Sequence, residues 1–272
     1  MPESPPESPP ESPPASPDAD LRLALTLADT ADRITLARFR AADLRVDRKP
    51  DRTPATDADT AAEDAIRAVL AEQRPGDAVL GEERGGSLDG RAWILDPIDG
   101  TKNYSRGLPV WATLIALAEQ GRPLVGVVSA PAMGRRWWAS AGGGAFTSDL
   151  GGAERRLAVS GVRDLADAYL STTELSSWQE LGTLDRYLRL AEQCWVVRAF
   201  GDFWQHVLVA EGAIDLGIDA EANTWDLAAL QLIVTEAGGT FTDLGGTARF
   251  DGGSGVSSNG ALHDAALAHL TA

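Results

Sequence analysis

Two aspartates in the segment 96–101 have the types and spacing of a metal or phosphate site. An apolar run ends at Asp96, the proline after it cannot donate to a strand ladder, and a tight turn then brings Asp99 back towards the same space. Gly100 lets the backbone approach a ligand closely, and the N–H groups of Gly100 and Thr101 could donate to an anion, particularly if a helix begins there. The segment therefore predicts two carboxylates that face one point beside an anion-binding turn.

Two further acidic residues are placed to join this pair. Glu82 follows a short strand-like run, which puts a carboxylate at a sheet edge, and Asp226 opens an apolar-periodic helical segment. Oxygen ligands suit hard cations such as magnesium or manganese, and no cluster of histidines or cysteines competes for zinc. Taken singly, Asp226 is typical of a first helical turn and Glu82 of a solvated turn, and either aspartate of the pair could simply form its turn. The complete segment 96–101 is much harder to explain in that way.

The elements that must hold these residues are indicated by periodicity. Apolar residues recur at helical spacing over residues 20–34, and a second helix is expected from about residue 59 to residue 73. Strand-like runs follow, and the link 120–123 has turn chemistry that predicts an antiparallel hairpin. The expected strands cover residues 78–80, 92–95, 110–118, 124–129 and 135–140.

The second half of the chain alternates strands and helices. Strands are expected at 195–200, 213–218 and 240–242, with helices at 203–211 and 225–237. The fold class is therefore α/β, an α+β-like layered sandwich in which an antiparallel sheet with paired helices precedes an α/β lobe. We divide the chain into a disordered Pro/Glu/Ser tail (1–19), a metal- and phosphate-binding lobe (20–158), and a lobe (159–272) that completes the metal site and the substrate pocket.

The composition argues against binding to nucleic acid or to a membrane. The formal net charge is -16 at pH 7, and such a surface repels nucleic acid and anionic membranes. No stretch approaches the roughly 18 apolar residues of a membrane span, and the single cysteine precludes an intrachain disulfide. A phosphate-bearing ligand would need a local positive centre, for which a bound cation is an obvious source. We expect a cytoplasmic protein that binds neither nucleic acid nor membrane.

The acidic motifs resemble the signature of the inositol monophosphatase family, which are metal-dependent, lithium-sensitive phosphatases of small phosphomonoesters. Residues 96–101 match its Asp-Pro-Ile-Asp-Gly-Thr motif, Glu82 lies in its Gly-Glu-Glu element, and residues 225–229 match its Trp-Asp-x-Ala motif. Order and spacing agree over about residues 20–270, so only the tail falls outside. The resemblance implies an inositol-monophosphatase-like fold, a homodimer, and two or three Mg²⁺ ions for which Mn²⁺ could substitute.

The resemblance also implies the metal ligands. Glu82, Asp96 and the carbonyl of Ile98 would hold a first metal. A second metal would be held by Asp96, Asp99 and Asp226. Glu82 would also share a third, loosely held ion, and we therefore count Glu82 among the expected catalytic residues.

The attacking water and the phosphate have implied partners as well. Asp57 matches the family position that pairs with the threonine of the Asp-Gly-Thr motif, so Asp57 and Thr101 would orient the water. The N–H groups of Gly100 and Thr101 would bind the phosphate. The resemblance therefore implies hydrolysis without a phosphoenzyme.

The substrate alcohol is indicated by weaker signals. Residues 198–204 and 111–114 look most like the histidinol-phosphate phosphatases within this family, especially actinobacterial ones. Histidinol phosphate carries an ammonium and an imidazole, so an acidic pocket would suit this cationic leaving group. The expected substrate-binding residues are Asp202, Asp219, Glu221 and Asn223. In the alternative, Asp202 only caps a helix that begins at residue 203, and the residues at 221 and 223 form a polar turn.

We favour hydrolysis of L-histidinol phosphate to L-histidinol, a step of L-histidine biosynthesis. Inositol 1-monophosphate is the alternative substrate, because Asp219 matches a position where the inositol enzymes use a carboxylate on the sugar hydroxyls. Fructose 1,6-bisphosphate and a 3′-phosphonucleotide are weaker options. A non-catalytic metal-binding protein is disfavoured because the acidic set is intact.

Overall fold

A computed structural model of the chain describes residues 17–48 and 53–271. Most of the expected tail, residues 1–16, lies outside the described residues. Residues 17–19 do not belong to a tail, because the first helix, α1 (Pro17–Arg38), already includes them. None of the helices in the described ranges combines the length and the apolarity that a membrane crossing requires.

The first half of the chain forms an eight-stranded sheet. Its order is β10-β9-β8-β7-β6-β5-β3-β4, and all neighbours are antiparallel except β3 and β5, which are parallel. The strands are β3 (Ala78–Gly81), β4 (Gly85–Gly86), β5 (Arg91–Asp99), β6 (Ala112–Glu119), β7 (Arg122–Ala130), β8 (Arg135–Ser140), β9 (Gly144–Asp149) and β10 (Arg155–Arg156). The expected antiparallel sheet is thus a mixed one. The parallel pair matters for the site because it brings the carboxyl ends of two strands to one edge.

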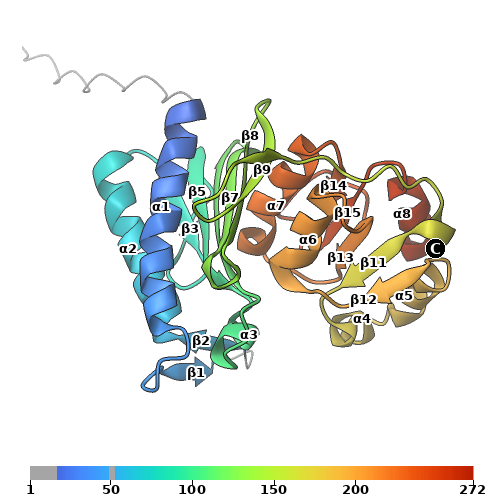
Figure 1. Ribbon diagram of the computed structural model, residues 1–272, viewed down its shortest axis with the longest axis horizontal. Coiled ribbons are helices and arrows are strands. Elements are labelled where there is room, and N and C mark those ends of the chain that lie inside the picture. The colour runs from blue at the N-terminus through green and yellow to red at the C-terminus, as the bar shows by residue number, and fades with distance from the viewer. Residues whose placement is uncertain (1–16, 49–52, 272) are drawn as a thin grey trace, which may run out of the picture.

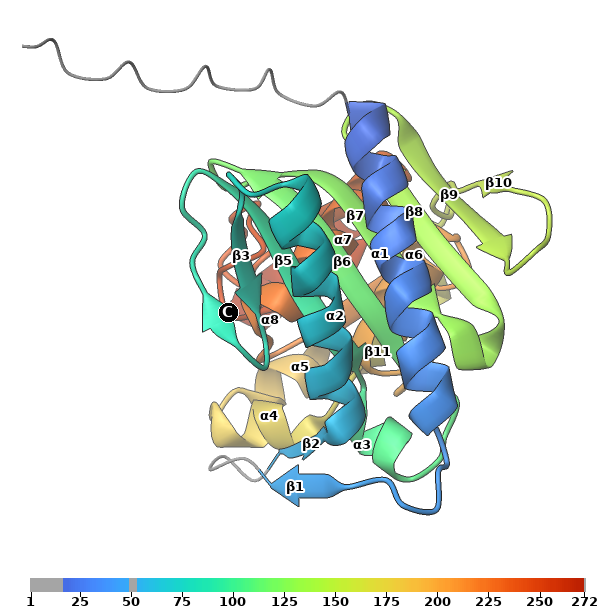
Figure 2. The ribbon, with the colours of Figure 1, turned by 90° about the vertical axis from the view of Figure 1, so that its left-hand side faces the viewer.

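Two long helices cover one face of this sheet. Figure 2 shows α1 and α2 (Asp57–Gln73) side by side in front of it. Small residues on α1, Ala24, Ala28 and Ala31, are fully buried and allow the helix to lie close to the strands. The ribbon of β1 (Val46–Arg48) and β2 (Pro54–Thr56) lies between the two helices in sequence. Both helices expected from periodicity are therefore present.

The second half builds a smaller sheet with helices on both sides. The sheet order is β12-β11-β13-β15-β14. Its strands are β11 (Tyr169–Thr172), β12 (Val196–Arg198), β13 (Leu216–Asp219), β14 (Thr240–Thr242) and β15 (Gly255–Ser258). The helices of the second half are α4 (Leu175–Glu180), α5 (Leu184–Ala191), α6 (Asp202–Ala210), α7 (Thr224–Glu236) and α8 (His263–Thr271), with a 3-10 turn at Leu165–Asp167. In the first half, the short helix α3 (Thr101–Ser105) follows β5, and a 3-10 turn at Pro131–Met133 follows β7.

The elements stack in five layers. Figure 1 shows α1 and α2, then the large sheet, then α6 and α7, then the small sheet, and finally α4, α5 and α8. The middle layer is buried on both sides, and one apolar cluster joins α6 and α7 to the large sheet. Gly126 of β7 permits this approach, because a Cβ there would lie 2.7 Å from the carbonyl oxygen of Ala229. The expected layered α/β class is present, whereas the division into two lobes at residue 158 stays a prediction.

Candidate metal and substrate site

The parallel pairing of β3 and β5 places Glu82 beside Asp96. Gly81 pairs with Leu95, so the residues that follow them lie at the same edge of the sheet. The N–H of Glu82 also donates to the carbonyl of Leu95 at 3.1 Å. The structure therefore has the acidic sheet edge that the sequence predicts.

A bulge in β5 turns Asp99 towards Asp96. We expected the strand to end at Asp96. It continues instead to Asp99, and its register against β6 shifts between Asp96 and Asp99. The bulge also accommodates Pro97, whose carbonyl accepts a hydrogen bond from the Thr113 hydroxyl at 2.8 Å. The N–H of Ile98 donates to Oδ1 of Asp96 at 2.9 Å. A proline without a ladder donor is thus compatible with a continuing strand.

Gly100 connects the strand to the short helix α3. It has φ 83°, in the left-handed region, and it is the N-cap of that helix. A Cβ at this position would lie 3.0 Å from the carbonyl oxygen of Val110 and 3.3 Å from Oδ2 of Asp202. The first N–H groups of a helix have no partner within the helix. A helix therefore begins at Gly100 and Thr101, the arrangement that we expected to favour donation from these N–H groups to an anion.

Asp226 reaches the same point from α7. It is the third residue of that helix after the N-cap Asn223, and its Oδ2 accepts the backbone N–H of Asn223 at 2.7 Å. This capping bond leaves Oδ1 for a ligand. The helix-start interpretation and the metal interpretation of Asp226 are therefore compatible, since each uses a different oxygen.

Asp96, Asp99 and Asp226 form the candidate metal centre. One carboxylate oxygen from each lies within 4.8 Å of the other two. Burial raises the pKa of Asp96 and Asp99 well above the usual range, and neighbouring carboxylates raise it further. Burial also raises the pKa of Asp226 to about 7, partly opposed by its bond to Asn223. Buried carboxylates at this separation repel one another, and an oxygen-binding cation would offset that repulsion. Glu82 lines the same cavity outside this group of three.

The hydroxyl of Thr101 faces Asp59 and not Asp57. Oγ1 of Thr101 lies 3.3 Å from Oδ1 of Asp59 and donates to the carbonyl of Ile98 at 2.8 Å. Asp57 instead forms an ion pair with Arg38 of α1 at 2.8 Å. The predicted Asp57–Thr101 pair is therefore wrong. The reason is helical phase, because the first and third residues of α2 point roughly 200° apart around its axis.

Asp59 is fully buried and is fixed by a capping box at the start of α2. Its Oδ2 accepts the N–H of Thr56 at 2.8 Å, which leaves Oδ1 to face Thr101. Burial raises the pKa of Asp59 to about 7, and the charges of nearby glutamates add to this effect. A threonine followed three residues later by an acidic residue is a known signal of this cap, and it could have identified Asp59.

Glu63 is a buried residue that our reading of the sequence missed. It lies on the inner face of α2, and its Oε2 accepts the N–H of Glu83 at 2.7 Å. Its Oε1 accepts the N–H of Arg84 at 3.2 Å. A Cβ at Gly81 would lie 2.1 Å from Oε1 of Glu63, so a larger residue there would displace the Glu63 carboxylate. Glu63 therefore holds the turn that carries Glu82. The sequence feature that could have identified Glu63 is an acidic residue within the apolar stripe of a helix.

The expected substrate residues line the same cavity as the metal centre. This cavity has a volume of about 780 Å³, and Asp202, Asp219, Glu221 and Asn223 contribute to its wall. Lys102 and Glu174, which we did not predict, also line it and form an ion pair with each other. The structure thus brings both predicted sets of residues into one space.

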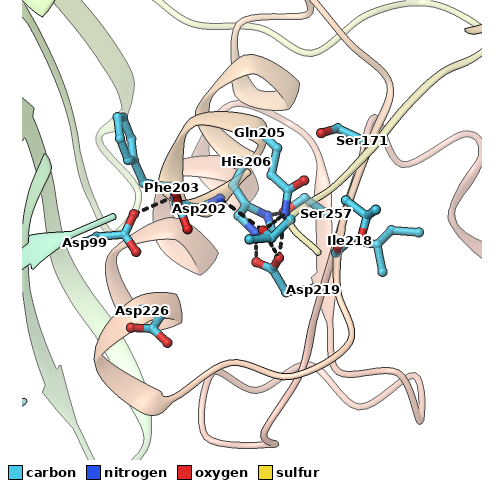
Figure 3. A network of polar contacts seen from close by, with 12 residues as sticks. Asp99, Ser171, Asp202, Phe203, Gln205, His206, Ile218, Asp219, Asp226 and Ser257 are labelled. Carbon is cyan, nitrogen blue, oxygen red and sulfur yellow. Dashed lines mark hydrogen bonds and ion pairs between the residues drawn. The ribbon is translucent and has the colours of Figure 1, made fainter. Parts of the chain in front are cut away.

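Asp202 contacts the metal-binding half of the cavity. The helix α6 begins at Asp202 itself, with Gly201 as N-cap, so Asp202 is not the cap of a helix starting at Phe203. Its Oδ2 accepts a hydrogen bond from the amide of Asn103 at 3.1 Å, and burial raises its pKa to about 6. The next N–H, of Phe203, donates to Oδ2 of Asp99 at 2.6 Å (Figure 3). The start of α6 therefore links the metal centre to the substrate side.

The layered fold and the acidic centre define a phosphoric monoester hydrolase of the metal-dependent class. The profile of the inositol monophosphatase family matches residues 17–272, and the chain belongs to this family. An inositol monophosphatase of known structure from Zymomonas mobilis has a TM-score of 0.84 and 31% identity, with 95% of this chain and 100% of that chain covered. The expected family and fold are confirmed.

Two curated relatives are similar over nearly their whole length. A histidinol-phosphatase from Mycobacterium tuberculosis is 56% identical over 255 residues, which cover 93% of this chain and 98% of the relative. A histidinol-phosphatase from Streptomyces coelicolor is 54% identical over 256 residues, with 92% and 96% covered. Both organisms are actinobacteria, the group that the sequence resemblance indicated.

Proposed function

We propose that this chain is a Mg²⁺-dependent histidinol-phosphatase, which hydrolyses L-histidinol phosphate to L-histidinol and phosphate. The observation that carries the proposal is that one cavity holds two sets of acidic residues. The first set, Asp96, Asp99 and Asp226, is explained by a bound cation. The second set includes Asp202 and Asp219, and a leaving group with positive charge explains it. The identity to two histidinol-phosphatases supports the same substrate.

The metal ligands in this proposal are Glu82, Asp96, Asp99, Asp226 and the carbonyl of Ile98. When bound, Mg²⁺ would supply positive charge to the phosphate oxygens and would activate a water for attack. The ligand set fits this ion because all its donors are oxygen. Two or three ions, and replacement by Mn²⁺, belong to the same proposal.

Residues around the first turn of α3 would handle the phosphate and the water. The N–H groups of Gly100 and Thr101 would donate to phosphate oxygens. The hydroxyl of Thr101 and the carboxylate of Asp59, which lie 3.3 Å apart, would orient the water. Asp59 thereby takes the role that the sequence assigned to Asp57.

The substrate side of the cavity would bind the alcohol. Asp202 and Asp219 project from α6 and β13, and Glu221 and Asn223 lie in the connection to α7. An ammonium or imidazolium group placed there would find carboxylate acceptors, whereas the hydroxyls of inositol would leave this negative charge unpaired. A homodimer and a cytoplasmic location are further proposals from the family resemblance.

A phosphate-release assay with purified protein tests the proposal. We expect the specificity constant kcat/KM for histidinol phosphate to exceed that for inositol 1-phosphate, with activity lost on removal of Mg²⁺ by a chelator and restored by its return. An equal or greater kcat/KM for inositol 1-phosphate would instead support the inositol monophosphatase alternative. If no small phosphomonoester released phosphate, the catalytic assignment itself would be wrong.

A further inference from the structure

We propose that His206 and Ser257 are positioning residues, which hold the carboxylate of Asp219 in place for the positive charge of the substrate. This inference rests on the proposed function, because it concerns how the cavity selects a phosphomonoester whose alcohol carries positive charge. Neither residue was predicted from the sequence to have a role in the site. His206 lies inside α6, and Ser257 lies in β15, the central partner of β13 and β14.

A chain of hydrogen bonds joins these residues to the cavity. His206 is fully buried, its Nε2 lies 2.7 Å from Oδ2 of Asp219, and its Nδ1 lies 2.6 Å from Oγ of Ser257 (Figure 3). A carboxylate can only accept, so Nε2 donates to Asp219. The hydroxyl of Ser257 can donate or accept, and it therefore satisfies Nδ1 in either form of the ring. The ring is thus held at both nitrogens, and it holds Asp219 in turn.

The other oxygen of Asp219 is bound just as firmly. Oδ1 accepts from Nε2 of Gln205 at 2.7 Å and from the hydroxyl of Thr173. A carboxylate offers about four acceptor positions, and these three donors use three of them. Asp219 is 7% exposed and lines the cavity, so the remaining position is available to a ligand there. A carboxylate fixed by three donors needs no reordering when a ligand cation binds.

A second buried histidine provides an internal comparison. His263 of α8 has Nδ1 at 2.9 Å from Oγ of Ser258 and Nε2 at 3.0 Å from Oγ1 of Thr242. Ser257 and Ser258 are consecutive in β15, so their side chains lie on opposite faces of the small sheet. His263 is also buried, but its ring bonds to hydroxyls and not to a carboxylate. Asp219, the partner of His206, lines the cavity, whereas Ser258 and Thr242, the partners of His263, do not. The pair His263 and Ser258 therefore isolates the structural role of a buried histidine from the proposed positioning role.

The test compares matched variants on two phosphomonoesters, one whose alcohol carries positive charge and one whose alcohol is uncharged. H206N and S257A would be assayed beside H263N and S258A, with histidinol phosphate and with glycerol 2-phosphate at saturating Mg²⁺. We expect H206N to lower the ratio of kcat/KM between the two substrates about tenfold, because it removes a hydrogen bond to a charged group. S257A should lower the ratio less. H206Q retains a donor that can reach Asp219 and should restore much of the ratio.

The control variants decide between positioning and packing. All four variants should lower the melting temperature, but H263N and S258A should leave the substrate ratio at the wild-type value. The inference fails if H206N leaves the ratio unchanged, or if H263N lowers it equally. Failure of the proposed function is a separate outcome, visible in the wild-type protein as no preference for histidinol phosphate over glycerol 2-phosphate, and it would overturn the inference as well.

Discussion

At the metal end of the cavity, Asp96, Asp99 and Asp226 lie within reach of one another, and each accepts a backbone N–H. At the substrate end, Asp219 accepts from three side chains that come from α6 and from the segment after β11. The three carboxylates at the metal end are held by backbone N–H groups, and their negative charges repel one another when no cation lies between them. The carboxylate of Asp219 is held by side-chain hydrogen bonds and needs no cation. Changes at the two ends should therefore have effects of different kinds and sizes.

The largest effect should come from removing a metal ligand. D226N keeps the side-chain shape and the capping bond but removes a negative charge from the centre. We expect kcat/KM to fall roughly a thousandfold or more, because metal charge supplies several kcal/mol to the transition state. D99N should behave in the same way.

The measurement is phosphate release over a range of Mg²⁺ concentrations. D64N is the matched control, since Asp64 is an exposed partner of Arg84 on the outer side of α2. Near-normal activity of D226N at low Mg²⁺ would refute the ligand assignment.

The second-largest effect on activity should distinguish Asp59 from Asp57. D59N removes the carboxylate that faces Thr101, and we expect kcat to fall about a hundredfold, as for loss of a group that acts on the attacking water. D57N breaks only the partly exposed contact with Arg38 and should change kcat less than about threefold. Steady-state kinetics of both variants provide the check, and a larger loss in D57N would return the role to Asp57.

A smaller effect is expected at the substrate end. D202A removes a carboxylate from the substrate side of the cavity and should raise KM for histidinol phosphate about tenfold, because one interaction with a positively charged group is lost. The effect on inositol 1-phosphate should be smaller. Equal losses on both substrates would mean that Asp202 acts through its contacts with Asn103 and the start of α6 and not through the substrate's charge.

The smallest effect is a dependence of metal stabilisation on pH. The pKa of Asp226 is raised to about 7, so the metal-free native state holds an extra proton between the usual aspartate pKa of about 4 and pH 7. This group therefore lowers the free energy of unfolding as the pH rises through that window. A bound cation removes the penalty, because it favours the charged form. Added Mg²⁺ should raise the melting temperature more at pH 8 than at pH 5.5.

Differential scanning calorimetry with and without Mg²⁺ measures this shift. D226N, which has no proton to release at position 226, should show a smaller difference between the two pH values. A shift that is independent of pH in the wild-type protein would contradict the prediction.

Local patterns were enough to predict that Asp96, Asp99 and Asp226 lie close together. The segment 96–101, Glu82 and Asp226 are short motifs, and the helices α1 and α2 have an apolar period that can be counted along the chain. The pairing of Asp57 with Thr101 was predicted wrongly because the rotation of the helix was not known. The residue at which α2 begins decides whether position 57 or position 59 faces Thr101. The continuation of β5 past Asp96 was missed because a bulge depends on the partner strand β6.

The substrate end shows what only the tertiary structure decided. The strand β15, with sequence Gly-Val-Ser-Ser, has no alternation of apolar and polar residues and was not predicted. Both faces of that strand are buried, so its serines need partners, and these are His206 from α6 on one face and His263 from α8 on the other. Such partners are far away in the sequence. Periodicity and motifs report on neighbours along the chain, whereas a buried polar group is satisfied by whatever the fold brings next to it.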